Sequence, residues 1–283
     1  MIVNKNTKYL SLGGKIADLQ SGLIMGVINV TPDSFYKNSR VDNIHDIVEK
    51  IAQMLEEGMD ILDIGGFSSR PGASLPGERE EWDRLLPVLK RISIEFPDLA
   101  LSIDTFRSEI ARRSVSEYGV SMINDISGGG MDEKMPSVIA ELQVPVVLMH
   151  MQGNPETMQK EPVYSDVVLE IIHYFTRQTK LFQDKGVNDI IIDPGFGFGK
   201  TAVHNYTILN KLDMFSILNR PILVGISRKS MIYESLNCTP EEAMNGTTVL
   251  NSIARYNGAD ILRVHDVREA SECLKLVNRL KTI

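Results

Sequence analysis

Cysteine is scarce in this sequence. Cys238 and Cys273 are the two cysteines among 283 residues, and neither belongs to a CxxC pair or a Cys/His cluster. Disulfide-stabilised secreted domains and structural zinc sites need more cysteines at closer spacing. The sequence therefore predicts two reduced thiols and a cytoplasmic protein.

Long apolar runs and an excess of positive charge are also absent. No stretch reaches the roughly 20 apolar residues that span a bilayer, and residues 1–15 lack the apolar core of a signal peptide. The 30 Lys and Arg residues are outnumbered by 37 Asp and Glu residues, which gives a net charge of −7. Because general nucleic-acid binders carry the opposite balance, we expect neither a membrane nor a nucleic-acid partner.

The chain contains eight short apolar runs, rich in Val and Ile, that alternate with helix-period segments. Such runs are typical of parallel strands buried on both faces. They cover residues 24–30, 61–64, 100–103, 120–123, 144–148, 189–192, 222–226 and 261–264. The repeated unit of helix and strand predicts an α/β fold, a (β/α)8 TIM barrel that forms a single domain over residues 1–283.

Glycines mark the ends of several helix-period segments in this repeat. Four helix-period segments end at a Gly that is followed two positions later by a small polar residue, at Gly58, Gly119, Gly186 and Gly258. Gly adopts the left-handed conformation that ends a helix. A further pair, Gly13 and Gly14, predicts the turn of a β-hairpin within residues 8–20. We expect this hairpin to precede the barrel and cover its N-terminal mouth.

Polar residues follow each predicted strand at once. In an α/β barrel the C-terminal ends of all eight strands meet on the catalytic face. Buried carboxylates need donors there, which adjacent N–H groups of a ligand would supply. The deep polar residues are Asp63, Asp104, Asn124 and Asp193. The cations that would hold a phosphate or diphosphate are Arg70, Arg228, Lys229 and Arg263, with His265.

Two features of this face favour structural roles. The segment from Gly195 to Thr201 looks like a nucleotide-binding P-loop, but Pro194 stands where that motif needs a glycine. His150 follows a strand, yet no second His or Cys lies at metal-ligand spacing. We therefore expect neither ATP binding at Lys200 nor a metal at His150.

Read in order, eight strand-end segments resemble those of dihydropteroate synthases, the pterin-binding barrel enzymes of folate biosynthesis. The segments, over about residues 25–267, are NVTPDSF, DIGGFSSRPGA, SIDTFR, INDISGG, LMHMQGNPETMQ, DPGFGFGK, GISRKS and RVHDV. The resemblance implies condensation of 6-hydroxymethyl-7,8-dihydropterin diphosphate with p-aminobenzoate to 7,8-dihydropteroate and diphosphate. It also implies a Mg²⁺ cofactor, a homodimer packed through the late helices and competitive inhibition by sulfonamides.

The resemblance further implies a role for each matching residue. The catalytic residues would be Asp104, Lys229 and Arg263. The pterin would be bound by Asp104, Asn124, Met149, Asp193 and Lys229. The diphosphate would be bound by Asn29, Ser69, Arg70, Arg263 and His265, with Asn29 also holding Mg²⁺. The aminobenzoate pocket would be formed by Phe35, Ser69, Arg70, Pro71, Phe198, Lys229 and Ser230.

The chain departs from the family pattern in its first two loops. The first reads TPDSFYKNSRV where SFSDGG is common, and Ser69 stands where Thr is usual. Two alternatives remain open. A pterin-dependent methyltransferase of the same fold would have no diphosphate for GISRKS and RVHDV to hold. A non-catalytic relative would be expected to lose Lys229, Asp104 or the pair formed by Arg263 and His265.

Overall fold

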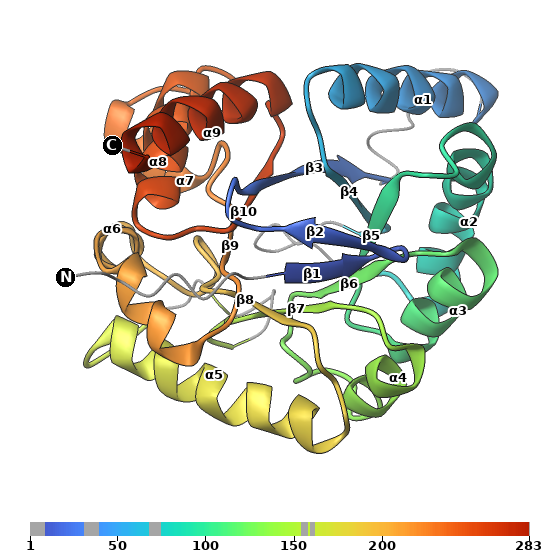
Figure 1. Cartoon of the computed structure of the whole chain (residues 1–283), viewed down its shortest axis with the longest axis horizontal. Coiled ribbons are helices and arrows are strands. Elements are labelled where there is room, and N and C mark those ends of the chain that lie inside the picture. The colour runs from blue at the N-terminus through green and yellow to red at the C-terminus, as the bar shows by residue number, and fades with distance from the viewer. Residues whose placement is uncertain (1–8, 31–39, 68–74, 154–157, 159–161, 283) are drawn as a thin grey trace.

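Eight parallel strands form the centre of the molecule (Figure 1). The computed structural model describes residues 9–30, 40–67, 75–153, 158 and 162–282. In sequence order the barrel strands are β3 (Leu23–Asn29), β4 (Ile61–Gly65), β5 (Ala100–Asp104), β6 (Met122–Asp125), β7 (Val146–Met149), β8 (Ile190–Asp193), β9 (Leu223–Val224) and β10 (Ile261–Val264). One continuous ladder joins β8 back to β3 and on to β10 and β9, and a bridge between Ile192 and Ile222 closes the ring. The predicted barrel is confirmed.

Helices surround the strands on the outside of the barrel (Figure 1). They are α1 (Arg40–Glu56), α2 (Glu78–Glu95), α3 (Ser108–Tyr118), α4 (Met135–Leu142), α5 (Val167–Asp184), α6 (Ala202–Asn210), the 3₁₀ helix η2 (Leu212–Leu218), α7 (Ser230–Leu236), α8 (Met244–Tyr256) and α9 (Val267–Lys281). Within the described ranges, no helix combines the length and apolar character needed to cross a membrane.

The four predicted helix stops adopt the expected backbone. Gly58, Gly119, Gly186 and Gly258 have φ angles of 99°, 67°, 95° and 113°, values that favour glycine. The change of direction that each provides brings the chain back to the start of the next strand.

The polar residue two positions after such a glycine ties neighbouring strands together. Asp60 accepts a hydrogen bond of 2.8 Å from the backbone N–H of Ile24, and Asp260 accepts one of 2.8 Å from that of Ile222. Ser121 bonds the backbone of β5 in the same way. These side chains satisfy backbone groups at the N-terminal ends of the strands, where regular pairing stops.

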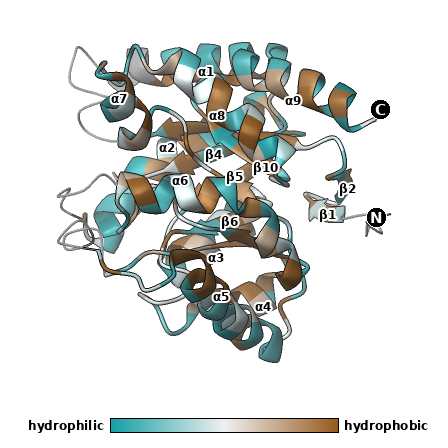
Figure 2. Ribbon diagram, turned by 90° about the vertical axis from the view of Figure 1, so that its left-hand side faces the viewer, coloured by the Kyte–Doolittle hydropathy of each residue, from teal (hydrophilic) through white to brown (hydrophobic). Residues whose placement is uncertain are grey.

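The predicted hairpin is confirmed and closes one end of the barrel. It consists of β1 (Tyr9–Leu12) and β2 (Lys15–Asp18), joined by Gly13 and Gly14 with φ angles of 54° and 79°. Positive φ at both turn residues is the type I′ geometry that matches strand twist. Figures 1 and 2 show the hairpin lying across one end of the strand ring. Leu10, Leu12 and Leu19 are buried there against the first inward layer of the strands.

The interior of the barrel has an apolar layer beneath a polar one. The apolar layer contains Met25, Ile61, Met122, Val147, Ile191, Leu223 and Ile261. Side chains on one face of a strand recur every second residue. The next inward positions on six of these strands are therefore Asp63, Asn124, Met149, Asp193, Gly225 and Arg263. The strand period thus brings polar groups from distant parts of the sequence into one layer near the C-terminal mouth.

We predict that Leu10→Ala lowers the free energy of unfolding by about 2–5 kcal/mol, the usual cost of deleting a fully buried Leu side chain. Leu10 is 1% exposed. Urea denaturation measures the change. The matched control is Ile16→Ala on the same hairpin, where the side chain is 78% exposed, and a change within about 0.5 kcal/mol is expected. Equal losses for both variants would show that the hairpin does not seal the barrel.

Candidate active site

A guanidinium and two carboxylates form the centre of the polar layer. Arg263 on β10 donates from Nε to Asp63 Oδ2 at 2.8 Å and from Nη2 to Asp104 Oδ2 at 3.0 Å. Asn124 on β6 donates to the same Asp63 oxygen at 3.0 Å. Four strands therefore contribute to one hydrogen-bonded cluster, as the positions of these residues at strand ends predicted.

The cluster leaves two acceptors for a ligand. Asp63 Oδ1 and Asp104 Oδ1 are buried and have no hydrogen-bond partner among the described residues. Leaving a buried acceptor unpaired costs about 1–3 kcal/mol. Burial raises the pKa of Asp104 to about 8, opposed by Arg263 and reinforced by the charge of Asp63. A ligand edge that presents N–H donors would relieve both effects.

Lys229 and Asp193 lie close to the same cluster at the C-terminal mouth of the barrel, and the site that they form with it is called the well below. Lys229 donates to the carbonyl of Phe196 at 2.6 Å, and its Nζ lies 4.6 Å from the centre of the Phe198 ring. Burial lowers the pKa of Lys229 to about 8, against the attraction of Asp193. Burial also raises the pKa of Asp193, whose Oδ1 accepts from the backbone N–H of Gly195 at 2.7 Å. Cation and carboxylate are thus held close together at the base of one loop.

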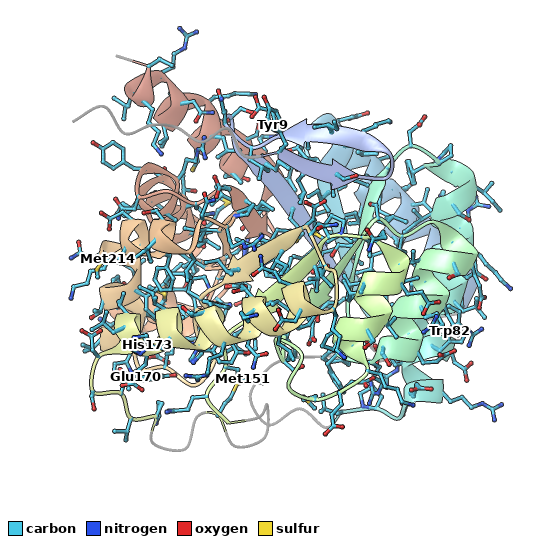
Figure 3. The ribbon with its side chains drawn as sticks, turned by 60° about the horizontal axis from the view of Figure 1, so that its bottom comes forward. Tyr9, Trp82, Met151, Glu170, His173 and Met214 are labelled. Carbon is cyan, nitrogen blue, oxygen red and sulfur yellow. The ribbon has the colours of Figure 1, made fainter. Side chains whose placement is uncertain are left out.

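An apolar wall completes the well. Met149 is buried in a cluster with Phe67, Phe106 and Ile126. Phe198 and Met151, the latter labelled in Figure 3, are partly buried against it. A flat ring could lie against this wall with its polar edge directed at the carboxylates.

Two further predicted anion-binding residues, His265 and Arg228, lie in the loops after β10 and β9. His265 is exposed directly after β10, with Nδ1 at 3.0 Å from the hydroxyl of Ser227. Partial desolvation, followed by the charge of Arg263, lowers its pKa to about 4. Arg228, grouped with the ligand cations on sequence, differs from that expectation. It makes a two-point ion pair with Asp266, at 2.9 and 2.7 Å, and so fastens the loops after β9 and β10 to each other.

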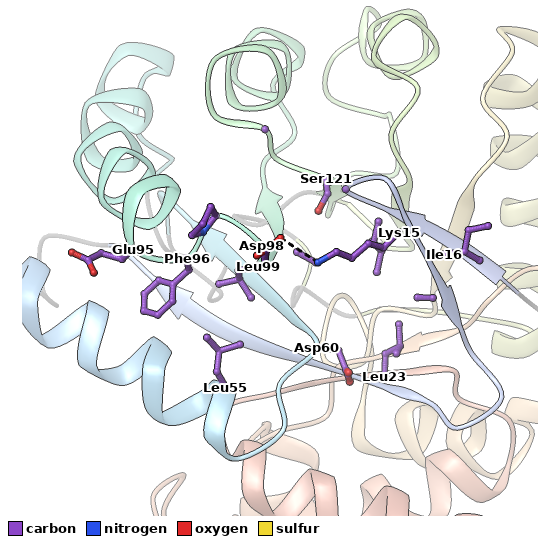
Figure 4. A pocket seen from close by; sticks show the side chains of 16 residues that line it. Lys15, Ile16, Leu23, Leu55, Asp60, Glu95, Phe96, Asp98, Leu99 and Ser121 are labelled. Atoms are coloured by element: carbon purple, nitrogen blue, oxygen red, sulfur yellow. Dashed lines mark hydrogen bonds and ion pairs between the residues drawn. The ribbon is translucent and has the colours of Figure 1, made fainter.

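A cavity of about 590 Å³ lies at the opposite end of the barrel, between the hairpin and the connection from α2 to β5 (Figure 4). Leu23, Leu55 and Phe96 contribute to its walls, and Lys15 reaches Asp98 across it at 3.4 Å. It lies at the N-terminal ends of the strands, far from the polar well. Because catalysis in this fold takes place at the C-terminal ends, we assign the site to the well.

Comparisons with known proteins agree with this geometry. The family model described as "Pterin binding enzyme" matches residues 25–265. The dihydropteroate synthase of Escherichia coli K12 is 41% identical over 266 residues, 93% of each chain. The chain belongs to the dihydropteroate synthase family of pterin-binding enzymes.

Solved structures of dihydropteroate synthases support the same family. That from Yersinia pestis, with a sulfonamide drug complex, superposes with a TM-score of 0.91 at 37% identity and covers 98% of this chain and 100% of its own. That from Thermus thermophilus, in complex with 4-aminobenzoate, has a TM-score of 0.85 at 35% identity and covers 96% and 100%. The chain is accordingly a transferase that forms a C–N bond with release of diphosphate. The relatives do not favour the methyltransferase alternative.

Asn29 is the predicted magnesium ligand of this dihydropteroate synthase family member. It is the exposed last residue of β3 and pairs in register with Gly65, which in turn pairs with Asp104. Among the residues that the structure describes, no group of three or more His, Cys, Asp or Glu side chains can hold a metal ion. Mg²⁺ at phosphate sites commonly takes one or two protein oxygens together with phosphate oxygens. A single Asn29 amide oxygen beside the well fits that donor set.

The remaining predicted residues divide into two groups. Ser230 begins α7 directly after Lys229 and is half-buried. Phe35, Ser69, Arg70 and Pro71 lie outside the described residues, as do positions 36–39, where the chain departs from the family pattern. Their predicted roles stay predictions.

Sequence reasoning missed one polar contributor and misjudged the partners of another. It expected ligand N–H groups as the donors to Asp63, but this carboxylate accepts from both Arg263 and Asn124. Glu81 is fully buried on α2, where it accepts from Thr105 at 2.7 Å and pairs with Arg107. A Glu among the inward positions of an amphipathic helix was the available signal, since buried carboxylates are rare unless paired.

We predict that Asp104→Asn changes the dependence of stability on pH. A carboxyl with a raised pKa favours folding while protonated. The contribution of Asp104 to the free energy of unfolding is complete when the pH is below the ordinary pKa of 3.8. It is lost as the pH rises towards the folded-state pKa of about 8. The amide variant lacks this loss, so the free energy of unfolding of the variant minus that of the parent should increase from pH 5 to pH 8. Urea denaturation at both values tests this, and a constant difference would contradict the assigned direction.

Proposed function

We propose that the chain condenses 6-hydroxymethyl-7,8-dihydropterin diphosphate with p-aminobenzoate to form 7,8-dihydropteroate and diphosphate. The observation that carries this proposal is the unpartnered carboxylate oxygen of Asp104 beside Arg263 and Lys229. A pterin edge offers several N–H donors and one carbonyl, which matches carboxylate oxygens next to an ammonium.

The pterin would lie in the well with its donors directed at Asp104, Asn124 and Asp193. Met149 would contact one face of the ring, because it belongs to the buried apolar wall. Lys229 would donate to the pterin carbonyl. Its lowered pKa reduces the cost of burying the amine beside a neutral ring.

Departure of diphosphate is the difficult step. The C–O bond breaks with its electron pair going to the leaving oxygen, so positive groups at that oxygen lower the barrier. Arg263 would supply this charge from within the well, and Arg70 would add to it. His265 and Ser69 would contribute neutral hydrogen-bond donors to the diphosphate. When bound at Asn29, Mg²⁺ supplies further positive charge to the diphosphate oxygens.

The methylene cation left behind would be stabilised by the electron-rich dihydropterin and by Asp104, which the N–H donors of the bound pterin would keep ionised. The neutral amine of p-aminobenzoate then forms the new C–N bond and loses a proton to solvent, so a strong base is not required. Phe198, Lys229 and Ser230 would form the described part of the aminobenzoate pocket. The relatives solved with 4-aminobenzoate and a sulfonamide drug support an aminobenzoate site in the proposed function. Competition between a sulfonamide and p-aminobenzoate in steady-state kinetics tests it.

We predict that Lys229→Ala and Asp193→Asn each lower turnover at least tenfold, because each removes a pterin contact within the well. The measurement is aminobenzoate-dependent diphosphate release with dihydropterin diphosphate and Mg²⁺. Lys211→Ala, an exposed lysine at the end of α6, is the control and should keep full activity. If the parent protein shows no aminobenzoate-dependent release, the proposed reaction is wrong.

The homodimer and the cytoplasmic location also belong to this proposal. An apolar stripe on α8 supports a dimer through the late helices. Val249, Ile253 and Tyr256 are spaced at helical intervals, and their side chains are 49%, 40% and 61% exposed. Contiguous exposed apolar patches of this kind commonly mark protein interfaces.

We predict that Ile253→Asp converts the dimer to a monomer, since a carboxylate would be buried without a partner at the interface. Sedimentation velocity measures the mass. Leu181→Asp on α5, where the side chain is 44% exposed, is the matched control and should leave the dimer intact. A parent protein that sediments as a monomer at micromolar concentration would overturn the dimer.

A further inference from the structure

Lys200 is a buried cation that the proposed chemistry does not use. It follows the Gly-rich segment after β8 and is 4% exposed. Its Nζ donates to the carbonyls of Gly195 and Phe198, each at 2.9 Å, and of His150 at 3.1 Å. The Nδ1 of His150 lies 3.1 Å away on the same amine. Four acceptors therefore surround one nitrogen.

These contacts satisfy a fully buried amine. An ammonium has three protons and no acceptor, and three carbonyl oxygens meet that demand. Burial, followed by the charge of Lys200, lowers the pKa of His150 to about 2, so the ring is neutral and Nδ1 can face the cation as a lone pair. Burial lowers the pKa of Lys200 to about 7, while Asp193 favours the charged form.

The loop held by Lys200 has an unusual backbone. Gly195, Gly197 and Gly199 have φ angles of 72°, 80° and 61°. A Cβ at Gly195 would collide with the carbonyl oxygen of His150, and one at Gly199 would lie 2.7 Å from that of Gln152. The loop after β8 therefore lies directly against the loop after β7, and the Lys200 amine bonds both.

The same loop holds the site lysine on its other side. The carbonyl of Phe196, between two residues bound by Lys200, accepts from Lys229 at 2.6 Å. The Phe198 ring lies 4.6 Å from the same Lys229 nitrogen, and the Phe198 carbonyl is bound by Lys200. The two lysines thus share one short segment of backbone.

We propose that Lys200 is a positioning residue: by binding the carbonyls of Gly195 and Phe198 it sets the Phe196 carbonyl and the Phe198 ring that orient Lys229. The inference rests on the proposed function, because it assigns the segment to the aminobenzoate side of that site. Lys200, whose sequence position resembles that of a P-loop lysine, therefore binds the carbonyls of its own loop instead of a phosphate.

The kinetic test compares Lys200→Ala, Lys200→Met and the exposed control Lys211→Ala. We expect the KM for p-aminobenzoate to rise at least tenfold in both Lys200 variants and to stay unchanged in the control. Propylammonium matches the part of the side chain that Ala removes. It should restore at least a third of the lost activity to Lys200→Ala. It should not restore Lys200→Met, whose side chain fills the space. An unchanged KM in both variants overturns the proposal.

Hydrogen–deuterium exchange of the peptide over residues 194–200 provides a readout that does not depend on turnover. Exchange should quicken at least tenfold in Lys200→Ala and Lys200→Met and return towards the parent rate in Lys200→Ala with propylammonium. Unchanged exchange in both variants overturns the role of Lys200. If the parent makes no dihydropteroate, the proposed function fails while exchange still decides this inference. Thermal melting identifies a variant that does not fold, and the other variant then decides.

Discussion

The ion pair of Arg263 with Asp63 and Asp104 is the interaction on which the rest of the site depends. Two carboxylates buried this close repel each other, and the guanidinium between them makes their coexistence possible. Removing one partner of such a buried group typically costs about 3–5 kcal/mol, because the remaining charge is left uncompensated. The arrangement also leaves one buried oxygen of each carboxylate without a hydrogen-bond partner among the described residues. Structural pairing and ligand binding are therefore two uses of the same side chains.

The apolar layer beneath this cluster strengthens the ion pair of Arg263 with Asp63 and Asp104. Below the polar layer the barrel is filled by apolar side chains and sealed by Leu10 and Leu12 of the hairpin. Electrostatic interactions strengthen where water is excluded. The apolar layer therefore increases both the stabilisation from the Arg263 contacts and the free-energy cost of losing one of them. The same exclusion shifts the pKa values of Lys229 and Asp104 towards neutrality.

Much of the fold was predictable because it rests on local patterns. Short apolar runs, Gly stops at Gly58 and Gly258, and the paired turn glycines each depend on a few adjacent residues. Polar residues at strand ends located the site for the same reason, since a parallel barrel brings those ends together. Strand bounds were predicted less well. The run predicted over residues 120–123 is β6 at Met122–Asp125, and the run predicted over residues 222–226 is paired as a ladder only at Leu223–Val224.

Partner choice was not predictable, because it depends on distances that no local pattern encodes. Arg228 and Arg263 look equivalent in sequence, yet one binds Asp266 at the rim and the other binds Asp63 in the well. Asp63 and Arg263 are 200 positions apart, and only closure of the ring brings them together. The glycines next to Lys200 likewise made it look like the phosphate-binding lysine of a P-loop. In the structure it binds backbone carbonyls, and one of them belongs to His150 in another loop.

The hairpin at the N-terminal mouth has a consequence for the order in which the substrates bind. Leu10, Leu12 and Leu19 pack into that end. In the part of the chain that the structure describes, the barrel is therefore closed at its N-terminal end. In the proposed arrangement the pterin lies deeper in the well than p-aminobenzoate. It would therefore have to bind before p-aminobenzoate covers it, and the order of binding would follow from depth alone.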